Sequence, residues 1–343
     1  MVASWAEQTI AQFFEHREYP TQSQCDDSAR IISGMPEVRA VDTPGSLSYT
    51  VRCIGQSNNN DTQDLIVSFR NLESMIDADL VLLAKSIHGA LVPKATYHGQ
   101  MSGASPPLHI YTMPCLPGIS CLETLSDETV LNPEDEFRHT CYVKHLASYF
   151  ARCWSNPQPV DPQVQGNYKE GIQLRLKKFR ESPPPGALPY TKIPELESNL
   201  SVLFGQAYPQ VFTHGDLSHT NILVDKKTLE ITGIVDWSLA RLLPFGMELE
   251  SLVSTTGCMT LNGWQSYTCR QQLLDAFWEE FWIQCRINDN LRQQEIRDMA
   301  MQAAKIGAVL HHAFERNEDG SPSERLTTSE WALKILQVAC MDY

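Results

Sequence analysis

One segment carries most of the chemical information in the chain: residues 211–246, VFTHGDLSHTNILVDKKTLEITGIVDWSLARLLPFG. An apolar entry leads to the tripeptide HGD, which ends in Asp216. Four residues then separate Asp216 from Asn221, and Asp236 follows after two short apolar runs, ILV and ITGIV. Runs of this kind on either side of the turn DKKTLE predict a β-hairpin. The hairpin would bring all three polar side chains together, because Asp216 and Asn221 precede its first strand and Asp236 follows its second.

The three side chains suit a divalent cation that prefers oxygen ligands. Carboxylates and amides are typical ligands of Mg²⁺. The ion usually takes only one or two of its ligands from the protein and the rest from phosphate and water. The tripeptide HGD alone is usually an ordinary turn. The prediction therefore rests on the joint pattern of HGDxxxxN, two strands and a later Asp-Trp.

This spacing resembles the catalytic loop and the magnesium-binding Asp of protein kinases. The resemblance implies that Asp216 accepts the proton of a substrate hydroxyl, and that Asn221 and Asp236 hold the metal. No segment that resembles a protein-kinase activation loop follows Asp236, so the acceptor is expected to be a small molecule rather than a protein.

More specifically, the chain resembles the aminoglycoside phosphotransferase and choline kinase group, in which HGDxxxxN and Asp-Trp replace the protein-kinase motifs. PGSLSYTVR, LIVSFR and HIYTMPCLPG extend the resemblance over roughly residues 5–250 and point to a fungal branch of phosphotransferase-like proteins. It implies an α+β, bilobed protein-kinase-like fold. We expect a small N-lobe with an antiparallel sheet (1–112), a hinge (113–118) and a larger, mainly helical C-lobe (119–343).

The resemblance also locates a nucleotide site in the N-lobe. A turn of small residues between two strands can direct backbone N–H groups at phosphate oxygens. Gly45, Ser46 and Ser48 form the candidate turn, although it has one glycine where the family has more, and an ordinary hairpin turn would show the same residues.

A cation, usually lysine, is expected on the next strand to bind the α- and β-phosphates. Arg70 occupies that position here, and its guanidinium is always charged and binds phosphate well. Its partner acid would be Asp77 (or Asp79) on the following helix, with a purely structural pair as the alternative. Met113 and Cys115 in the hinge would offer backbone groups to adenine.

Composition excludes several classes of protein. The 343 residues are 42% hydrophobic, which is enough for a large core, and 27 basic against 41 acidic residues give a net charge of −14. Such a surface should repel nucleic acid and anionic membranes. The densest basic run, 175–180, has helical spacing and is interpreted as a solvated helix face.

Cysteine usage and the N-terminus indicate a cytoplasmic, thiol-reduced protein. The ten cysteines are scattered, with no CxxC and no Cys/His cluster at zinc spacing. Residues 1–20 include acidic positions and lack a continuous apolar run, so they predict an amphipathic helix and no signal peptide.

Periodicity predicts the remaining elements coarsely. Helices are expected at 25–34, 74–88, 139–154, 272–285 and 293–316, strands at 46–55, 64–70 and 108–116, and loops at 156–167 and 181–194. The aromatic stripe of the helix at 272–285 is interpreted as core and not as a ligand site.

These observations favour an ATP- and Mg²⁺-dependent phosphotransferase that acts on a hydroxyl of a small metabolite. The alternative is a kinase-fold protein without phosphoryl transfer, either a binding protein or an enzyme for another reaction, and Arg70 and the single glycine motivate it. Glu248 and Glu250 would attract a cationic amine of the acceptor, or else lie on a solvated face.

Overall fold

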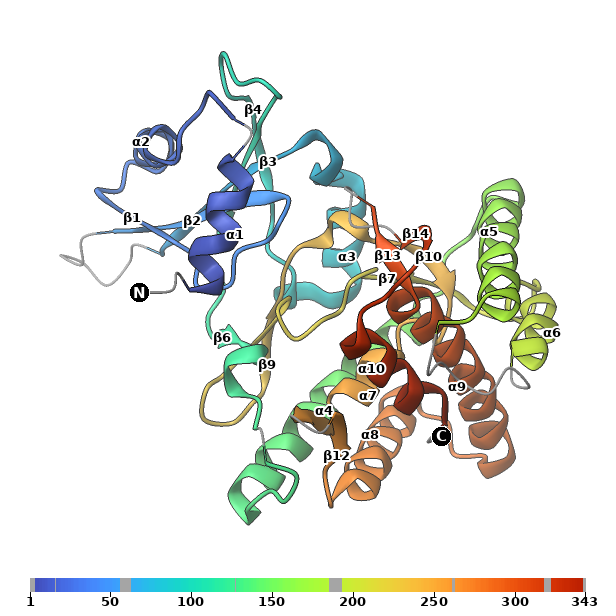
Figure 1. The fold of residues 1–343 in the computed structure, drawn as a ribbon. Coiled ribbons are helices and arrows are strands. Elements are labelled where there is room, and N and C mark those ends of the chain that lie inside the picture. Colours follow the sequence, from blue (N-terminus) through green and yellow to red (C-terminus); the bar gives the residue numbers. More distant parts are fainter. Residues whose placement is uncertain are drawn as a thin grey trace.

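The computed structural model describes residues 4–15, 17–55, 63–126, 128–184, 193–260, 263–317 and 322–341. Figure 1 shows a smaller N-terminal part, built on a sheet, beside a larger part built mainly of helices. This is the α+β, kinase-like architecture that the sequence predicts.

The N-terminal sheet has five antiparallel strands in the order β1-β2-β3-β5-β4. Their bounds are β1 Glu37–Ala40, β2 Ser48–Ile54, β3 Leu65–Arg70, β4 Thr96–Gln100 and β5 His109–Pro114. The strands expected at 46–55, 64–70 and 108–116 are confirmed. The sequence did not predict β1 and β4, because neither shows an alternation of buried and exposed residues.

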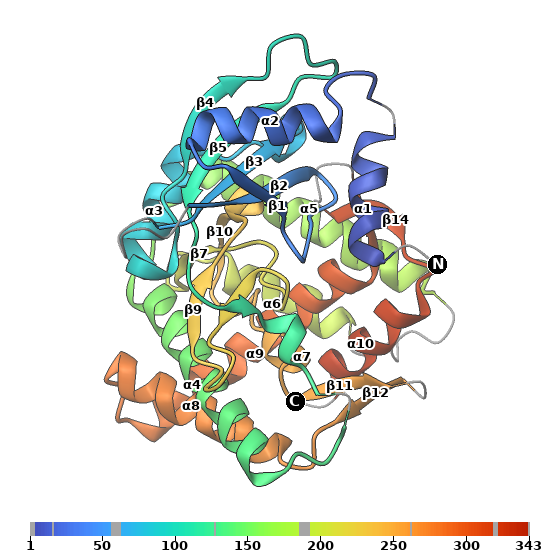
Figure 2. The same ribbon diagram turned by 90° about the vertical axis from the view of Figure 1, so that its left-hand side faces the viewer.

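Two helices, α1 (Trp5–Phe14) and α2 (Gln22–Ser33), pack on this sheet. Figure 2 shows α2 lying across the strands. Their contact is a separate apolar core that includes Phe13, Cys25, Tyr49, Val67 and Phe69. Both predicted helices are thus confirmed, and both cover buried apolar surface, which is the main stabilising contribution to such a layer.

The next helix begins later than the sequence suggests. Residues Leu72–Ser74 form a 3-10 turn (η1), and α3 runs from Ala78 to His88 with Asp77 as its N-cap. A second 3-10 turn, η2 (Gly89–Leu91), follows it. The helix α3 packs against α4 of the larger part, so it connects the two parts.

The chain passes from one sheet to another directly after β5. The short strand β6 (Ile119–Ser120) pairs with β8 (Ile222–Val224), which pairs with β9 (Ile231–Ile234). The connection runs tightly over β9: a Cβ on Gly118, whose φ is +106°, would lie 2.4 Å from Thr232 Oγ1. Only glycine fits this close approach.

The larger part contains most of the helices. They are η3 Cys121–Thr124, α4 Pro133–Ser155, α5 Pro162–Glu181, α6 Ile193–Leu203, η5 Trp237–Leu239, α7 Glu250–Ser254, α8 Arg270–Cys285, α9 Asn290–His312 and α10 Glu330–Met341. Three antiparallel pairs of strands complete it: β7 Gln210–Thr213 with β10 Arg241–Pro244, β11 Gly257–Thr260 with β12 Gly263–Ser266, and β13 Phe314–Arg316 with β14 Pro322–Leu326.

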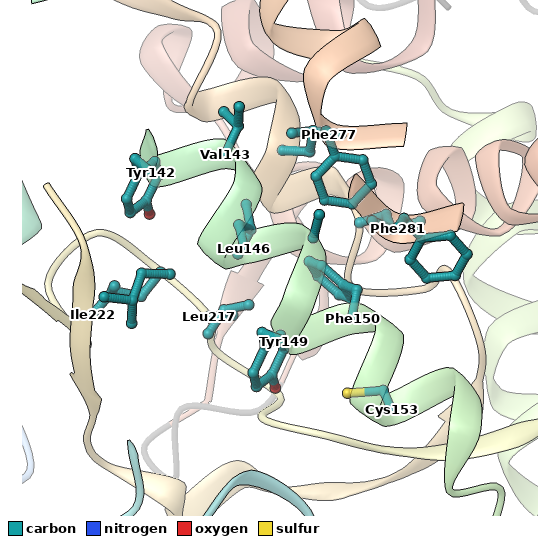
Figure 3. Close-up of a cluster of buried hydrophobic side chains, with 14 of the residues drawn as sticks. Tyr142, Val143, Leu146, Tyr149, Phe150, Cys153, Leu217, Ile222, Phe277 and Phe281 are labelled. Carbon is teal, nitrogen blue, oxygen red and sulfur yellow. The ribbon is translucent and has the colours of Figure 1, made fainter. Parts of the chain in front are cut away.

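The long helix α4 lies at the centre of this part and packs most extensively on α8. Figure 3 shows Phe150 of α4 next to Phe277 and Phe281 of α8, and on the opposite side of α4 Leu217 and Ile222 from the segment around the HGD motif. The aromatic stripe of α8 is therefore core, as predicted. The helix α4 thus also supports the loop that carries the candidate catalytic residues.

Other predicted element boundaries are wrong as well. The helix predicted at 293–316 ends at His312, because residues 314–316 pair with β14. The loop predicted at 156–167 is shorter, because α5 begins at Pro162 behind the N-cap Asp161. Most of the loop predicted at 181–194 lies outside the described residues. None of the helices among the described residues combines the length and the hydrophobicity that a membrane span needs.

Candidate active site

A cavity of about 510 Å³ lies where the N-terminal sheet meets the HGD segment. Its lining residues come from the β1–β2 connection, the end of β3 and the η1 turn, the HGD loop, the Asp-Trp turn, and the end of α9 with the segment after it. They are Gly45, Ser46, Leu47, Ser48, Arg70, Ser74, Asp216, Thr220, Asn221, Asp236, Ser238, Leu239, His311, Arg316 and Asn317. Seven of the ten residues that the sequence assigns to the site line this one cavity.

The loop that holds Asp216 begins at the end of β7 and turns sharply at Gly215. The φ of Gly215 is +84°, and a Cβ there would lie 2.1 Å from the carbonyl oxygen of Leu239. Glycine is thus required both by the backbone conformation and by the close passage of the Asp-Trp turn. The turn leaves the Asp216 carboxylate about one-third exposed in the cavity wall.

Glu248 supports this loop through hydrogen bonds to its backbone. Its two carboxylate oxygens accept hydrogen bonds from the backbone N–H groups of His214 (3.1 Å) and Gly215 (2.6 Å), and Tyr149 Oη donates to it at 3.3 Å. Burial raises the pKa of the Glu248 carboxyl, although the two backbone N–H groups that it accepts oppose the shift. The prediction that Glu248 attracts an amine or lies on a solvated face is wrong, because its oxygens are occupied beneath the loop.

The neighbouring His214 is completely buried and positions the same loop. Its Nε2 lies 2.8 Å from the carbonyl oxygen of Val235, and its Nδ1 accepts the N–H of Asp216 at 3.3 Å. With these partners, Nδ1 is the acceptor of the ring and Nε2 faces a carbonyl oxygen to which it donates. His214 therefore connects the strand end before Asp236 to the backbone of Asp216.

Asn221 and Asp236 meet Asp216 as the hairpin predicts. Asn221 Nδ2 donates to the carbonyl oxygen of Asp216 at 2.9 Å and to its Oδ2 at 3.2 Å, which leaves the amide oxygen Oδ1 as a possible metal ligand. Strands β8 and β9 pair antiparallel between these residues, so the predicted hairpin is confirmed. Asp236 adopts a left-handed conformation, with φ +64°, at the start of the η5 turn.

Arg70 lies at the end of β3 and is almost fully buried. Both of its terminal nitrogens lie 3.0 Å from Asp236 Oδ1, while Nη1 also donates to the carbonyl oxygen of Ser74 at 3.0 Å. Burial raises the pKa of the Asp236 carboxyl, but the Arg70 charge and the Ser238 hydroxyl outweigh it and hold that pKa below its usual value. Asp236 is therefore an anion with one oxygen, Oδ2, not used by Arg70.

Asp77 does not take the role expected for it. Its Oδ1 accepts the backbone N–H groups of Asp79 (2.9 Å) and Leu80 (3.2 Å), so it caps the N-terminus of α3. Arg70 instead forms its ion pair with Asp236. The predicted pairing of Arg70 with Asp77 or Asp79 is thus wrong, because the carboxylate is used by the helix end.

The turn at Gly45–Ser48 joins β1 to β2 and forms one wall of the cavity. The carbonyl oxygen of Leu47 accepts the N–H of Asn71 at 3.2 Å and the hydroxyl of Ser74 at 2.9 Å. The turn is therefore fastened to the segment that follows Arg70, so the candidate phosphate-binding backbone and the candidate phosphate-binding cation belong to one local structure.

Met113 and Cys115 lie at the end of β5 and beyond it, and neither lines the cavity. Met113 pairs with Ile66 in the β3–β5 ladder. The N–H of Cys115 donates to Asp64 O at 2.9 Å, and its carbonyl oxygen accepts Gln63 Nε2 at 3.2 Å. Of the two backbone groups of Cys115, only the carbonyl oxygen therefore keeps a lone pair for a ligand.

His311 and Arg316 line the cavity near Asp216, and Glu250 lies next to His311; the sequence did not connect these titratable residues. His311 Nδ1 lies 3.3 Å from Glu250 Oε1, and Arg316 Nη2 lies 3.9 Å from Asp216 Oδ1. Burial raises the pKa of Glu250 to about 7, and burial together with Arg316 lowers the pKa of His311 to about 4. Burial thus favours the uncharged forms of Glu250 and His311. Because Glu250 is mostly buried, the expectation that it lies on a solvated face is wrong.

Sequence reasoning missed Ser74, Ser238, His311 and Arg316 as cavity residues. Ser238 stands two residues after Asp236, so its proximity could have been inferred from spacing. For the two C-terminal residues no local signal exists, since the predicted helix at 293–316 would have kept them on a regular surface. Only the end of α9 at His312 and the turn into β13 bring them to the cavity.

Comparison with protein families identifies the class of molecule. Residues 68–277 match the model of the phosphotransferase enzyme family. This region is more than half of the chain and contains the end of β3 with Arg70, the HGD loop and the Asp-Trp turn. The chain belongs to the phosphotransferase enzyme family. A search of curated proteins finds no match.

Solved structures of similar fold include an ethanolamine kinase from Plasmodium vivax (9% identity, TM-score 0.51, covering 90% of this chain and 86% of the other). An aminoglycoside 2'-phosphotransferase in a GDP complex gives 14% identity and a TM-score of 0.50, covering 83% and 88%. An aminoglycoside 3'-phosphotransferase of type VIII gives 16% identity and a TM-score of 0.45, covering 81% and 98%. At these identities the likeness to the first two structures establishes the fold and not the substrate.

Proposed function

We propose that the chain is an ATP- and Mg²⁺-dependent phosphotransferase that phosphorylates a hydroxyl group of a small molecule. The observation that carries the proposal is the convergence of Asp216, Asn221, Asp236 and Arg70 on one cavity. Membership of the phosphotransferase family supports the same reaction type.

The residues present fit a magnesium ion. Asn221 Oδ1 and the Asp236 carboxylate would hold it, because they are hard oxygen ligands and because the pKa of Asp236 keeps it ionised. When bound, the ion neutralises phosphate charge. The remaining ligands would be water and phosphate oxygens.

The other residues bind and orient the reactants. Asp216 would accept a hydrogen bond from the acceptor hydroxyl and take its proton. As it does so, the hydroxyl oxygen would bond to the γ-phosphorus, and the bond from that phosphorus to the β–γ bridging oxygen would break. Arg70 and the N–H groups of the turn at Gly45, Ser46 and Ser48 would contact the phosphates. Catalysis of this kind is mostly positioning and charge stabilisation.

We assign the nucleotide to the lobe at 1–112, the hinge to 113–118 and the acceptor pocket to the lobe at 119–343. The change from the β5 sheet to the β6 sheet within residues 115–118 supports this division. Adenine would contact Met113 and the Cys115 carbonyl oxygen, with the Cys115 N–H retained by Asp64. Asp77 would act on the nucleotide only indirectly, by holding the start of α3. We place the enzyme in the cytoplasm.

One observation favours the second candidate, a kinase-fold protein without phosphoryl transfer. Arg70 stands where lysine is usual and holds Asp236 Oδ1 with two nitrogens. Metal binding must share or displace this contact. A pure binding protein, however, has no need of Asp216, which is held in the cavity wall by Glu248 and His214.

The experiment that tests the proposal is a screen of metabolite fractions for ADP release from ATP and Mg²⁺, with the wild type and Asp216→Asn in parallel. Asn keeps the shape of the side chain but cannot take the proton. A fraction that gives release with the wild type should give at least about 100-fold less with Asp216→Asn. Equal release from the two proteins would overturn the role of Asp216, and a phosphate-free product would favour the second candidate.

A further inference from the structure

A second cluster of metal-binding residue types lies outside the cavity. Cys141 and His145 are one helical turn apart on α4, and Glu230 reaches them from the turn between β8 and β9. One ligand atom of each residue, the Cys Sγ, a His ring nitrogen and a Glu oxygen, lies within 4.8 Å of the other two. Sequence spacing did not reveal this group, because the third residue joins from a distant part of the chain.

The three side chains are available for a ligand. Cys141 and His145 are half-buried and Glu230 is exposed. Within the described part of the chain, no hydrogen bond or ion pair engages any of the three side chains. Cys141 has the carboxylate of Glu230 and the ammonium of Lys144 as its charged neighbours. The cluster is therefore not explained by internal pairing.

The backbone around the cluster is well fixed. Arg138 Nη2 of α4 donates to the carbonyl oxygen of Lys226 in the β8–β9 turn at 2.8 Å. Within that turn, Asp225 Oδ1 accepts the N–H groups of Lys227 (2.8 Å) and Thr228 (2.9 Å). Glu230 is thus presented to α4 by a hydrogen-bonded turn that is itself attached to the helix.

We propose that Cys141, His145 and Glu230 bind one Zn²⁺ ion, with a water molecule as the fourth ligand. Zinc accepts this mixture of sulfur, nitrogen and oxygen at about 2.0–2.3 Å, whereas Mg²⁺ and Ca²⁺ avoid sulfur. Around one tetrahedral ion the ligand atoms are about 3.3–3.8 Å apart, so side-chain shifts of about 1 Å suffice. As the zinc–sulfur bond forms, the Cys141 thiol releases its proton to water.

The consequence is a connection between the helical core and the catalytic segment. Strand β8 begins directly after Asn221, and β9 leads to Asp236. An ion that ties Glu230 to α4 would hold the closed end of this hairpin. None of its three ligands lines the cavity, so the site is separate from the one proposed for Mg²⁺.

The test is calorimetric titration of the metal-free full-length protein with Zn²⁺. We expect one equivalent to bind, and we expect Cys141→Ser and Glu230→Gln to weaken binding at least about 10–100-fold, the loss that even outer partners of metal ligands cause. Cys285→Ser is the matched control, since Cys285 is another half-buried helical cysteine. Its affinity should equal that of the wild type. Co²⁺ should give a sulfur-to-metal charge-transfer band that Cys141→Ser lacks.

Three results would overturn the proposal: no stoichiometric Zn²⁺ binding, equal affinity in the wild type and both ligand variants, or displacement of the bound Zn²⁺ by Mg²⁺ with ATP. The last would place the ion in the catalytic cavity. Glu230→Gln keeps the test valid if Cys141→Ser fails to fold, because Glu230 is exposed and the substitution preserves its size.

Discussion

Both terminal nitrogens of Arg70 lie 3.0 Å from a single oxygen of Asp236, Oδ1. The pair joins the last residue of β3 to the residue that begins the Asp-Trp turn, across the cavity. Because the other Asp236 oxygen is not used by Arg70, the same carboxylate can serve a metal ion while it stays paired.

This relationship predicts different outcomes for two substitutions of Arg70. Arg70→Lys keeps one charge at Asp236 and should retain Mg²⁺-dependent ATP binding within about 10-fold. Arg70→Met leaves Asp236 without its cation and should raise the pKa of that carboxyl and weaken Mg²⁺–ATP binding much more. The loss of unfolding free energy should stay below the about 3–5 kcal/mol of a fully buried pair, because the Asp236 side chain is 35% exposed. Equal ATP affinity in both variants would contradict this role.

Gly215 should tolerate no side chain. Gly215→Ala would place a Cβ 2.1 Å from Leu239 O at a φ of +84°, so we expect a loss of about 3 kcal/mol or more and loss of activity. Gly166→Ala is the control: it lies in α5, has open space around its Cβ, and should stabilise the protein by about 0.5–1 kcal/mol. Chemical denaturation measures both. A neutral Gly215→Ala would contradict the close approach of the Leu239 carbonyl oxygen to Gly215.

Glu248 should act through the loop and not through the acceptor. In Glu248→Gln an amide N–H₂ replaces one of the two oxygens that accept the N–H groups of His214 and Gly215, so one buried donor loses its acceptor at a cost of about 1–3 kcal/mol. We expect kcat to fall while KM for the acceptor changes little. Steady-state kinetics separate the two constants, and a rise in KM alone would indicate an acceptor contact instead.

The pH dependence of stability should reveal Glu250. Its pKa of about 7 lies above the ordinary value of 4.5, so the folded state favours the protonated form and loses stability as pH rises from about 4.5 through 7. The pKa values of His311 and His312 are lowered to about 4 and about 3, so these two residues increase the stability of the folded state as pH rises. This increase is complete above the ordinary histidine pKa of 6.5. Between pH 6.5 and 8 the two histidines therefore no longer offset the loss of stability that the ionisation of Glu250 causes.

Glu250→Gln removes this titration. Relative to the variant, the wild type should lose about 1 kcal/mol of unfolding free energy between pH 6.5 and 8. Denaturation curves of both proteins at the two pH values give the difference, in which other titrating groups cancel. Parallel pH profiles would show that Glu250 is ionised in the folded protein throughout this range.

The sequence was informative where the signal is local. The hairpin after HGD could be predicted because strands, turn and polar residues follow each other within one segment, and the convergence of Asp216, Asn221 and Asp236 followed from it. The Arg70–Asp236 pair could not be predicted, because the partner of Arg70 depends on how β3 and the Asp-Trp turn meet in space. Asp77, the partner expected from the sequence, instead caps a helix locally. Arg316 was missed because apolar residues continue the helical pattern past His312, and only pairing with β14 ends it.

The central claim, that this cavity binds ATP with Mg²⁺ through Asn221 and Asp236, is tested most directly by the melting temperature with ATP, with and without Mg²⁺. A ligand that binds the native state raises the melting temperature. We predict a Mg²⁺-dependent increase with ATP for the wild type, and little or none for Asp236→Asn and Asn221→Ala, each compared with its own ligand-free melting temperature. An unchanged wild-type melting temperature at every Mg²⁺ concentration, or an equal increase in both variants, would contradict the account.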